Sequence, residues 1–203
     1  MTIRRGAAWG EAVGVPDGLT VIGSDAELHD LVDAWRTGGV ALPPIGLGGG
    51  DLARTVAGGS DDQFTNGSTR LPLDLVRVEA AGATTWSVAH VVCRRSWWRG
   101  EVVVAMTAQF LRRLDVVPRG HPNDGRLDLL RVDPAMPARV RWQAARRART
   151  GTHLPHPQLA VSQPTAVELT FARPLHLWVD GRRWHTTAEV RLTVEPDAYA
   201  AHV

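Results

Sequence analysis

The hydrophobic pattern of this chain changes near residue 70, and that change limits its fold more than any other feature. Before it, a short apolar run at 19–23 ends in glycine, and a segment at 24–39 carries apolar residues at i, i+3, i+4 and i+7. These patterns predict a buried strand followed by an amphipathic helix. A strand at 40–42, a glycine-rich turn and a short helix at 51–56 then complete a β-α-β-loop-α order, typical of an α/β sheet.

After residue 70 the chain consists of short β-rich runs separated by turn residues, which is the spacing of an antiparallel sandwich or sheet. The runs lie at 70–78, 84–92, 101–106, 109–117, 126–132, 166–172, 174–179 and 188–194. Asp180-Gly181 predicts a type I′ hairpin turn. One helix interrupts the strands, with Asp133-Pro134 as its predicted start and Gly151 as its stop. We therefore predict an α+β fold with a small α/β lobe at 1–69 and a larger antiparallel β-sandwich-like lobe at 70–203.

The amino-acid composition limits the ligands and partners that the chain can bind. All 23 Lys+Arg residues are arginine, so a phosphate would have to be bound by arginine, backbone amides or metal. A net charge of +2 does not favour a nucleic-acid partner, and we expect none. Cys93 is the only cysteine, which excludes disulfides and a cysteine metal cluster. No apolar run reaches the ~18 residues of a membrane span, and the N-terminal segment has no apolar signal core. We expect a cytoplasmic protein.

Two segments near the N-terminus can be explained by local structure alone, without a bound ligand. Ser24-Asp-Ala-Glu27 is an S-x-x-E pattern before the amphipathic helix, which predicts a capping box. Ser24 would accept a hydrogen bond from the Glu27 amide, and Glu27 would reach back to the Ser24 amide. A capping box occupies the same amides that a phosphate would use, so the two roles compete. The Gly48–Gly50 run is equally compatible with a flexible turn.

Several short motifs occur in one order along the chain and together resemble the diacylglycerol, sphingosine and bacterial lipid kinase family. That family carries GGDGT, GTGND, DG-x-LD and DGE motifs. The corresponding segments here are Gly23-Ser24-Asp25-Ala26-Glu27, Leu47-Gly48-Gly49-Gly50-Asp51, Asn123-Asp-Gly-Arg-Leu-Asp128, Gly151-Thr-His153, Val179-Asp-Gly181 and Val194-Glu-Pro. The resemblance covers residues 19–203. It implies a reduced nucleotide-binding lobe and a lipid-kinase β lobe.

The resemblance also implies roles for individual residues. ATP would bind at the two glycine turns, through Gly23, Ser24, Asp25, Ala26, Glu27, Gly48, Gly49, Gly50 and Asp51. Asp180 would be the general base that takes the proton from a lipid hydroxyl, while magnesium spreads the charge of the transferred phosphoryl group. A structural magnesium site would use the Asp124 carboxylate and the carbonyls of His121 and Arg126. Asp25, Asp51, Asp124 and Asp180 are expected to converge on one cleft.

Departures from the family pattern leave alternative functions open. Glu27 replaces the threonine of GGDGT, Arg182 replaces the glutamate of DGE, and the strands that open the family's nucleotide lobe are mostly missing from this sequence. The first hypothesis is an ATP-dependent lipid kinase. The second, which these departures favour, is a pseudo-kinase that acts as a lipid- or protein-binding module. The third is a β-sandwich binding domain whose motif matches are chance.

The expected partners follow from the same resemblance. A lipid substrate or a membrane surface is expected, with the protein peripheral at the membrane. The arginine-rich helix at 138–149 is either a solvated face or a contact with anionic lipid. A second copy of the chain would cover a sheet edge left open by the missing strands.

Overall fold

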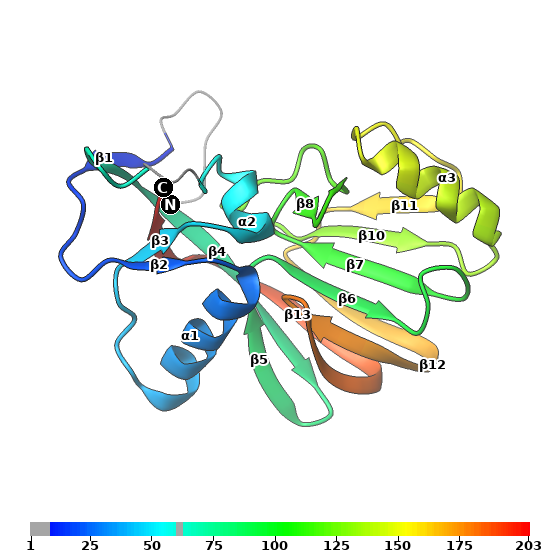
Figure 1. Cartoon of the computed structure of the whole chain (residues 1–203). Helices are drawn as coiled ribbons and strands as arrows, with labels where there is room; N and C mark the ends of the chain where they lie inside the picture. The colour runs from blue at the N-terminus through cyan, green and yellow to red at the C-terminus, as the bar shows by residue number, and fades with distance from the viewer. Residues whose placement is uncertain (1–8, 60–62) are drawn as a thin grey trace.

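The computed structural model describes residues 9–59 and 63–203, and Figure 1 shows the path of the chain. Its elements are β1 (Glu11–Val13), β2 (Thr20–Ile22), α1 (Asp25–Gly38), β3 (Ile45–Leu47), α2 (Gly50–Thr55), β4 (Ser68–Ala80), β5 (Ala83–Ser87), β6 (His90–Arg94), β7 (Val102–Met106), β8 (Phe110–Leu111), β9 (Leu114–Asp115), β10 (Asp128–Val132), α3 (Ala138–Ala148), β11 (Leu159–Ser162), β12 (Ala166–Val179) and β13 (Arg182–His202). The α/β elements α1, α2, β2 and β3 lie at one end of the molecule, and β6, β7, β10, β11 and α3 lie at the other (Figure 1). The fold is α+β, as predicted.

One continuous sheet joins the two ends. Its main path runs β1-β4-β13-β12-β6-β7-β10-β11, and β3 joins it through a parallel pairing of Gly46 with His202. β2 pairs in parallel with β3, while β8 and β9 form a separate hairpin. The end of β13 therefore belongs to the α/β part of the sheet, although its start belongs to the antiparallel part. This long strand therefore connects the two regions within one sheet.

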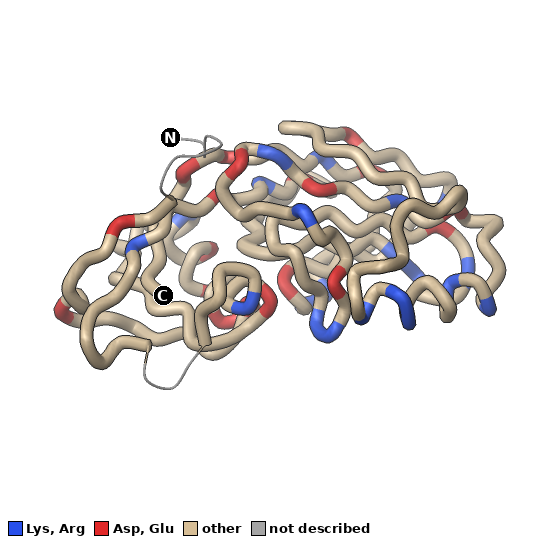
Figure 2. Tube along the Cα trace, turned by 90° about the horizontal axis from the view of Figure 1, so that it is seen from above, with Lys and Arg blue, Asp and Glu red and all other residues tan. Residues whose placement is uncertain are grey.

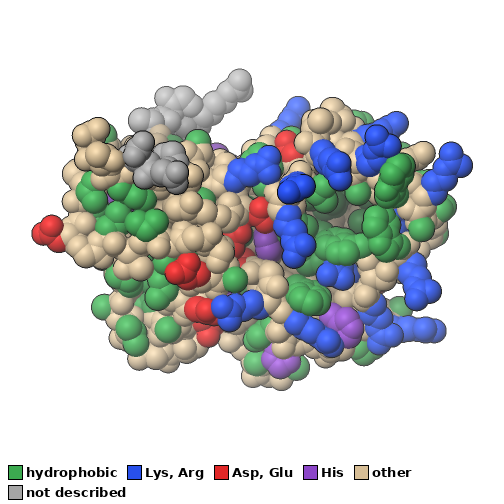
Figure 3. All heavy atoms as spheres, in the orientation of Figure 1, with side chains coloured by type: hydrophobic (Ala, Val, Ile, Leu, Met, Phe, Trp, Pro, Cys, Tyr) green, Lys and Arg blue, Asp and Glu red, His purple; other side chains and the backbone are tan. Residues whose placement is uncertain are grey.

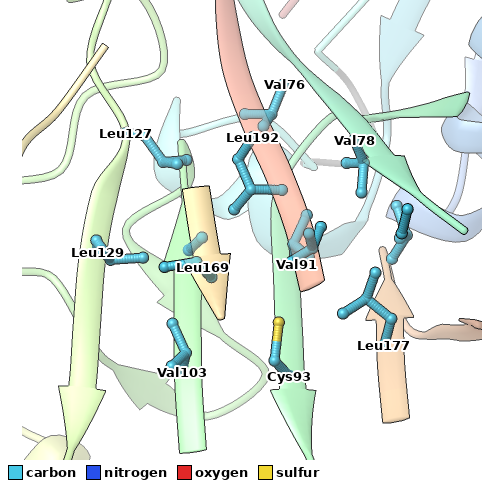
Figure 4. Packing of buried hydrophobic residues seen from close by; sticks show 14 of the residues in the cluster. Val76, Val78, Val91, Cys93, Val103, Leu127, Leu129, Leu169, Leu177 and Leu192 are labelled. Carbon is cyan, nitrogen blue, oxygen red and sulfur yellow. The ribbon is translucent and has the colours of Figure 1, made fainter. Parts of the chain in front are cut away.

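Three buried clusters hold the sheet and helices together. In the largest, side chains of β4 and β13, such as Val76 and Leu192, pack in one cluster with side chains of β6, β7, β10 and β12, such as Val91, Val103 and Leu129 (Figure 4). A second cluster packs α1 and α2 against β2, β3 and the ends of β4 and β13. The third lies on the opposite face of β6, β7 and β10. The antiparallel region is thus sandwich-like, because strands of one curled sheet enclose its main core.

The strand predicted at 40–42 is wrong. These residues have no strand partner, and Val40 is 61% exposed. The second parallel strand is β3, whose three residues are all buried and pair with β2. Residues 39–41 are exposed and Leu42 only packs against the edge of the core, whereas all three residues of β3 are buried.

Several other elements differ from their predicted bounds. The runs at 166–172 and 174–179 form one strand, β12, whose register shifts between Thr170 and Leu175. The edge strands β1 and β11 were not predicted. α3 begins at Ala138 after Pro137 rather than at Asp133-Pro134, because the Asp133 carboxylate accepts the Ala135 amide and closes a separate turn. Among residues 9–59 and 63–203, no helix has the length and apolar character needed to cross a membrane.

Candidate functional site

Asp180 lies at the centre of the junction between the two regions. It occupies the β12–β13 turn, where its φ of 48° and that of Gly181, 85°, fit the predicted type I′ geometry. Its Oδ1 accepts hydrogen bonds from the Ser87 hydroxyl and the Ala89 and His90 amides. Its Oδ2 accepts from the Val88 amide at 2.9 Å. The turn thereby anchors the segment that joins β5 to β6.

The charge of this carboxylate is stabilised inside the protein. Burial alone would raise the pKa of Asp180, but hydrogen bonding and charge from His29 and His90 bring it below the usual value. His29 Nδ1 lies 3.4 Å from Asp180 Oδ2 and 2.8 Å from the Trp86 carbonyl oxygen, so this nitrogen carries the proton. Burial lowers the pKa of His29, but the contact with Asp180, the bond to the Trp86 carbonyl and the charge of Asp33 together raise it above its ordinary value.

A second group of acidic and histidine side chains adjoins Asp180. Asp25, at the start of α1, accepts the amides of Asp51 and Leu52 and thereby caps α2. Asp51 Oδ2 lies 3.2 Å from His90 Nε2 and also accepts the Arg112 amide. Single ligand atoms of Asp25, Asp51 and His90 lie within 4.8 Å of one another. We call these three residues the junction cluster.

The electrostatics of the junction cluster favour a cation. Burial raises the pKa of Asp25 to about 6, although the two amides that it accepts oppose the shift. Burial lowers the pKa of His90, but the hydrogen bond to Asp51 and the nearby carboxylates raise it above its ordinary value. Two carboxylates and an imidazole at this spacing are suitable ligands for a divalent metal ion.

The glycine run packs against the first turn and is not simply flexible. A Cβ on Gly49 would collide with the Gly23 carbonyl oxygen, and one on Gly50 would collide with the Asp25 carboxylate. Gly50 also has a φ of 100°, which disfavours other residues. The two turns can therefore lie back to back only if these positions carry no side chain.

The predicted capping box forms, with one difference. The Glu27 amide donates to Ser24 Oγ at 3.3 Å, as expected. The Glu27 carboxylate accepts the Gly23 amide at 2.8 Å instead of the Ser24 amide. Ser24 has extended backbone angles, which bring the amide of the preceding residue within reach of the carboxylate. Ala26 lies in the first turn of α1, between Ser24 and Glu27.

Asp124 belongs to a different centre, so only three of the four aspartates converge as expected. Asp124 Oδ1 accepts the Arg126 amide, which closes its own turn. The neighbouring Asp74 accepts hydrogen bonds from the Gly125 amide at 2.7 Å and from Asn123 Nδ2 at 3.2 Å. Asn123 Oδ1 is buried and has no hydrogen-bond partner among the described residues. We call Asp74, Asn123 and Asp124 the loop cluster.

The loop cluster also concentrates negative charge. Burial and the charge of Asp124 raise the pKa of Asp74 to about 6, and burial raises the pKa of Asp124. His121 lies close to both carboxylates, and burial lowers its pKa. Carboxylate and amide oxygens are the ligand types that a hard cation such as magnesium prefers, so the loop cluster is a candidate magnesium site. The carbonyls of His121 and Arg126 remain predicted ligands.

Sequence reasoning missed His29, His90 and Asp74. Asp74 and His90 stand within strongly apolar strand segments, LPLDLV and VAHVVC. A polar residue buried in such a strand is usually satisfied by a specific partner, so this pattern was a usable signal. His29 had no comparable signal, since it lies on an ordinary amphipathic helix. Its contact with Asp180 arises only when α1 packs at the junction.

The Asp180 network can be tested by stability. Asp180→Ala would leave three buried amides and one hydroxyl without an acceptor, so we expect a loss of about 4 kcal/mol or more in unfolding free energy. Asp180→Asn keeps one acceptor oxygen and should lose less. Urea denaturation of both variants measures the difference. A loss below about 1 kcal/mol for Asp180→Ala would show that the carboxylate is not a structural anchor.

The raised pKa of Asp25 predicts a pH effect. An acid whose folded pKa lies above its unfolded value stabilises the protein at low pH, and this stability is lost as pH rises through about 6. Lowering the pH from 7.5 to 5 should therefore stabilise the wild type by about 1 kcal/mol more than Asp25→Asn. Asp17→Asn, at an exposed loop position, is the control. Equal pH slopes for the wild type and Asp25→Asn would contradict the expectation.

Solved structures share this fold. Three solved structures of proteins from Bacillus anthracis str. Sterne, two described as putative diacylglycerol kinases and one as a diacylglycerol kinase, each cover 90% of this chain. The chain covers 77%, 77% and 75% of those proteins, with TM-scores of 0.64, 0.63 and 0.57. Sequence identities are 9%, 8% and 11%, so the likeness is one of fold. No curated protein is similar enough in sequence to count as a match.

The sequence itself matches one protein family. Residues 72–202, well over half of the chain, match the YegS C-terminal NAD kinase beta sandwich-like domain. The matched segment runs from β4 to the end of β13 and includes Asp180, His90 and the whole loop cluster. The chain therefore belongs to the YegS C-terminal NAD kinase beta sandwich-like family, on a fold that it shares with diacylglycerol kinases.

Proposed function

We propose that this chain is a diacylglycerol-kinase-like protein that does not transfer phosphate and instead acts as a binding module. The supporting observation is that the chain's own carboxylates occupy backbone amides at both glycine turns. Glu27 accepts the Gly23 amide before α1, and Asp25 accepts the first amides of α2. A triphosphate would need such amides free.

Electrostatics disfavours a triphosphate further. At about 4 Å and an effective dielectric of 20, one like-charge contact costs about 4 kcal/mol, roughly half the binding free energy of a micromolar ligand. Arg182 could compensate only if it faced the turn. Its guanidinium instead lies 2.5 Å from the Asp30 carboxylate on α1, where both side chains are about half exposed. ATP therefore does not fit these residues.

The proposed general base is also poorly suited to its task. A base must come within hydrogen-bond distance of the proton that it removes. The Asp180 side chain is 0% exposed and already accepts four hydrogen bonds. Its lowered pKa makes it a weaker proton acceptor than an ordinary aspartate. These properties support a structural role for Asp180 in this chain.

Magnesium fits better than ATP. Asp74 and Asp124, with the unpaired Oδ1 of Asn123, would hold it at the loop cluster. There the ion would neutralise two carboxylates and stabilise the loop between β9 and β10. Asp25, Asp51 and His90 offer a second position at the junction cluster. Neither position requires a nucleotide.

A retained lipid kinase is the second candidate. It is supported by the junction, where Asp25, Asp51 and Asp180 come together from three distant parts of the sequence. In that case a nucleotide would have to displace Glu27 from the Gly23 amide, and Asp180 would have to be released from its donors. The two candidates differ in ATP binding and in turnover, which can be measured separately.

Magnesium binding at the loop cluster predicts a thermal shift. Millimolar magnesium should raise the melting temperature of the wild type, because it relieves repulsion between Asp74 and Asp124. Asp124→Ala should abolish the part of the shift that comes from this cluster, whereas Asp25→Asn and Asp17→Asn should retain it. A wild type whose melting temperature does not respond to magnesium would make residues 121–126 an ordinary turn.

Nucleotide binding tests the proposed function directly. We expect no ATP–magnesium binding to the wild type at micromolar concentrations by calorimetry. The triple variant Ser24→Gly, Ala26→Gly, Glu27→Thr frees the amides and removes the charge, so its affinity should rise at least about tenfold. Glu189→Gln, which removes an exposed charge on β13, is the control. Micromolar ATP binding by the wild type, with phosphorylation of a diacylglycerol or sphingoid lipid, would establish the kinase instead.

A further inference from the structure

Three exposed tryptophans lie on one part of the surface. Trp97 and Trp98 occupy the turn between β6 and β7, and Trp142 lies on α3. They are 39%, 47% and 50% exposed. An indole ring is large and apolar, and its N–H prefers a polar partner, so tryptophan is enriched where an apolar phase meets water. Three such rings on neighbouring elements indicate an interaction surface.

The two elements that carry these rings are held together by a buried arginine. Arg141 on α3 is only 5% exposed. Its guanidinium donates to the Trp97 carbonyl at 3.3 Å and to the Gly100 carbonyl at 2.5 Å. It also donates to the carbonyls of Asp133 and Met136. The tryptophan turn and α3 therefore form one pre-organised unit, and little conformational entropy is lost when a partner binds.

Arginines accompany the tryptophans. The Arg94 guanidinium lies over the Trp97 ring at 4.4 Å, and that of Arg146 lies over the Trp142 ring at 4.9 Å. Further exposed arginines come from the same turn and from α3, which contains no acidic residue: Arg95, Arg99, Arg139 and Arg147. Figure 3 shows apolar side chains on this half of the molecule ringed by basic ones. We call this set the tryptophan–arginine surface.

We propose that the tryptophan–arginine surface docks the protein onto a bilayer that contains anionic lipid. Arginines near such a surface contribute about 1 kcal/mol each, and exposed indoles enter the headgroup region. Both contributions are needed, because the overall charge of +2 is too small to hold the chain at a membrane.

The arrangement fits a membrane better than a single-stranded nucleic acid. Nucleic-acid readers need open aromatic faces on which bases stack. Here a guanidinium already covers one face of the Trp97 ring and one of the Trp142 ring. Covered rings can still insert their edges among lipid headgroups, where the guanidinium meets phosphate. The occupant that matches both features is therefore an anionic lipid surface.

The surface extends towards the junction cluster. The turn between β8 and β9 carries Arg112, whose backbone amide donates to Asp51 at 2.8 Å. Burial lowers the pKa of Arg94, and the charge of Arg112 lowers it further, so this turn adds to the positive potential at Arg94. Acidic and histidine side chains are visible in the groove between the two halves on the same face (Figure 3). Docking would therefore bring this groove to the bilayer.

The inference deepens the proposed function by naming the partner of a binding module, but it does not depend on the loss of nucleotide binding. Co-sedimentation compares vesicles of phosphatidylcholine alone with vesicles that also contain phosphatidylglycerol. We expect binding only to the anionic vesicles, weakening as salt rises. Brominated lipid should quench tryptophan fluorescence in the bound protein, as insertion requires.

Variants locate the contact. Trp97→Ala with Trp98→Ala, and Arg146→Gln with Arg147→Gln, should each weaken vesicle binding about tenfold or more. Arg77→Gln with Arg191→Gln removes two exposed charges from β4 and β13 and should leave binding unchanged. Circular dichroism confirms that each variant is folded.

Several outcomes would overturn the inference: no binding of the wild type to anionic vesicles, equal binding to neutral vesicles, or equal loss in the Arg77/Arg191 control. Tighter binding to a single-stranded RNA oligonucleotide, abolished by the same tryptophan variants, would assign the surface to nucleic acid. Calorimetry with ATP keeps the two proposals apart. A protein that binds ATP and also binds vesicles through this surface refutes only the proposed loss of nucleotide binding.

Discussion

The buried carboxylate of Asp180 is the interaction on which the junction depends. A charge with no exposed side-chain surface is stable only if polar groups replace its water, and four donors do so here. These donors come from residues 87–90, and His29 adds a contact from α1. The same contacts orient His90, because its amide binds Asp180 while its ring reaches Asp51. The β12–β13 turn, the β5–β6 connection and α1 are thereby locked together.

This anchor creates a strongly acidic interior. Burial raises the pKa of Tyr199 well above its ordinary value, and the charges of Asp180, Asp25 and Asp74 raise it further. Such a field attracts cations and repels a triphosphate unless metal ions intervene. The internal caps act in the same direction, because each places a carboxylate where a phosphate would otherwise be. The proposed loss of nucleotide binding therefore rests on several parts of the structure and not on Glu27 alone.

Charge is distributed unevenly over the molecule. Viewed from above, acidic residues gather near the junction, whereas basic residues line one side of the half that carries α3 (Figure 2). A protein that meets an anionic bilayer through its basic side keeps its acidic groove beside the lipid headgroups, where a cation could bridge the two. The internal site and the exposed surface can therefore serve one binding role, even without chemistry on the bound lipid.

Local periodicity by itself determined most elements of this fold. The helix α1, its cap and the Asp180-Gly181 hairpin depend on residues within a few positions of one another. The helix and the hairpin form as predicted, and the capping box forms except that Glu27 accepts the Gly23 amide instead of the Ser24 amide. The alternation of apolar residues likewise identified most strands of the antiparallel region. The order of motifs indicated the family, which the match over residues 72–202 confirms.

Only the tertiary structure decided the pairings between distant segments. Edge strands β1 and β11, and the choice of 45–47 over 40–42, depend on which segment finds a partner and burial. The positions of His29 and His90 at the junction, and the separation of Asp124 from the other aspartates, also depend on which distant segments pack together. Such contacts join residues far apart in sequence, so their geometry follows from the packing of the whole sheet and not from any local pattern.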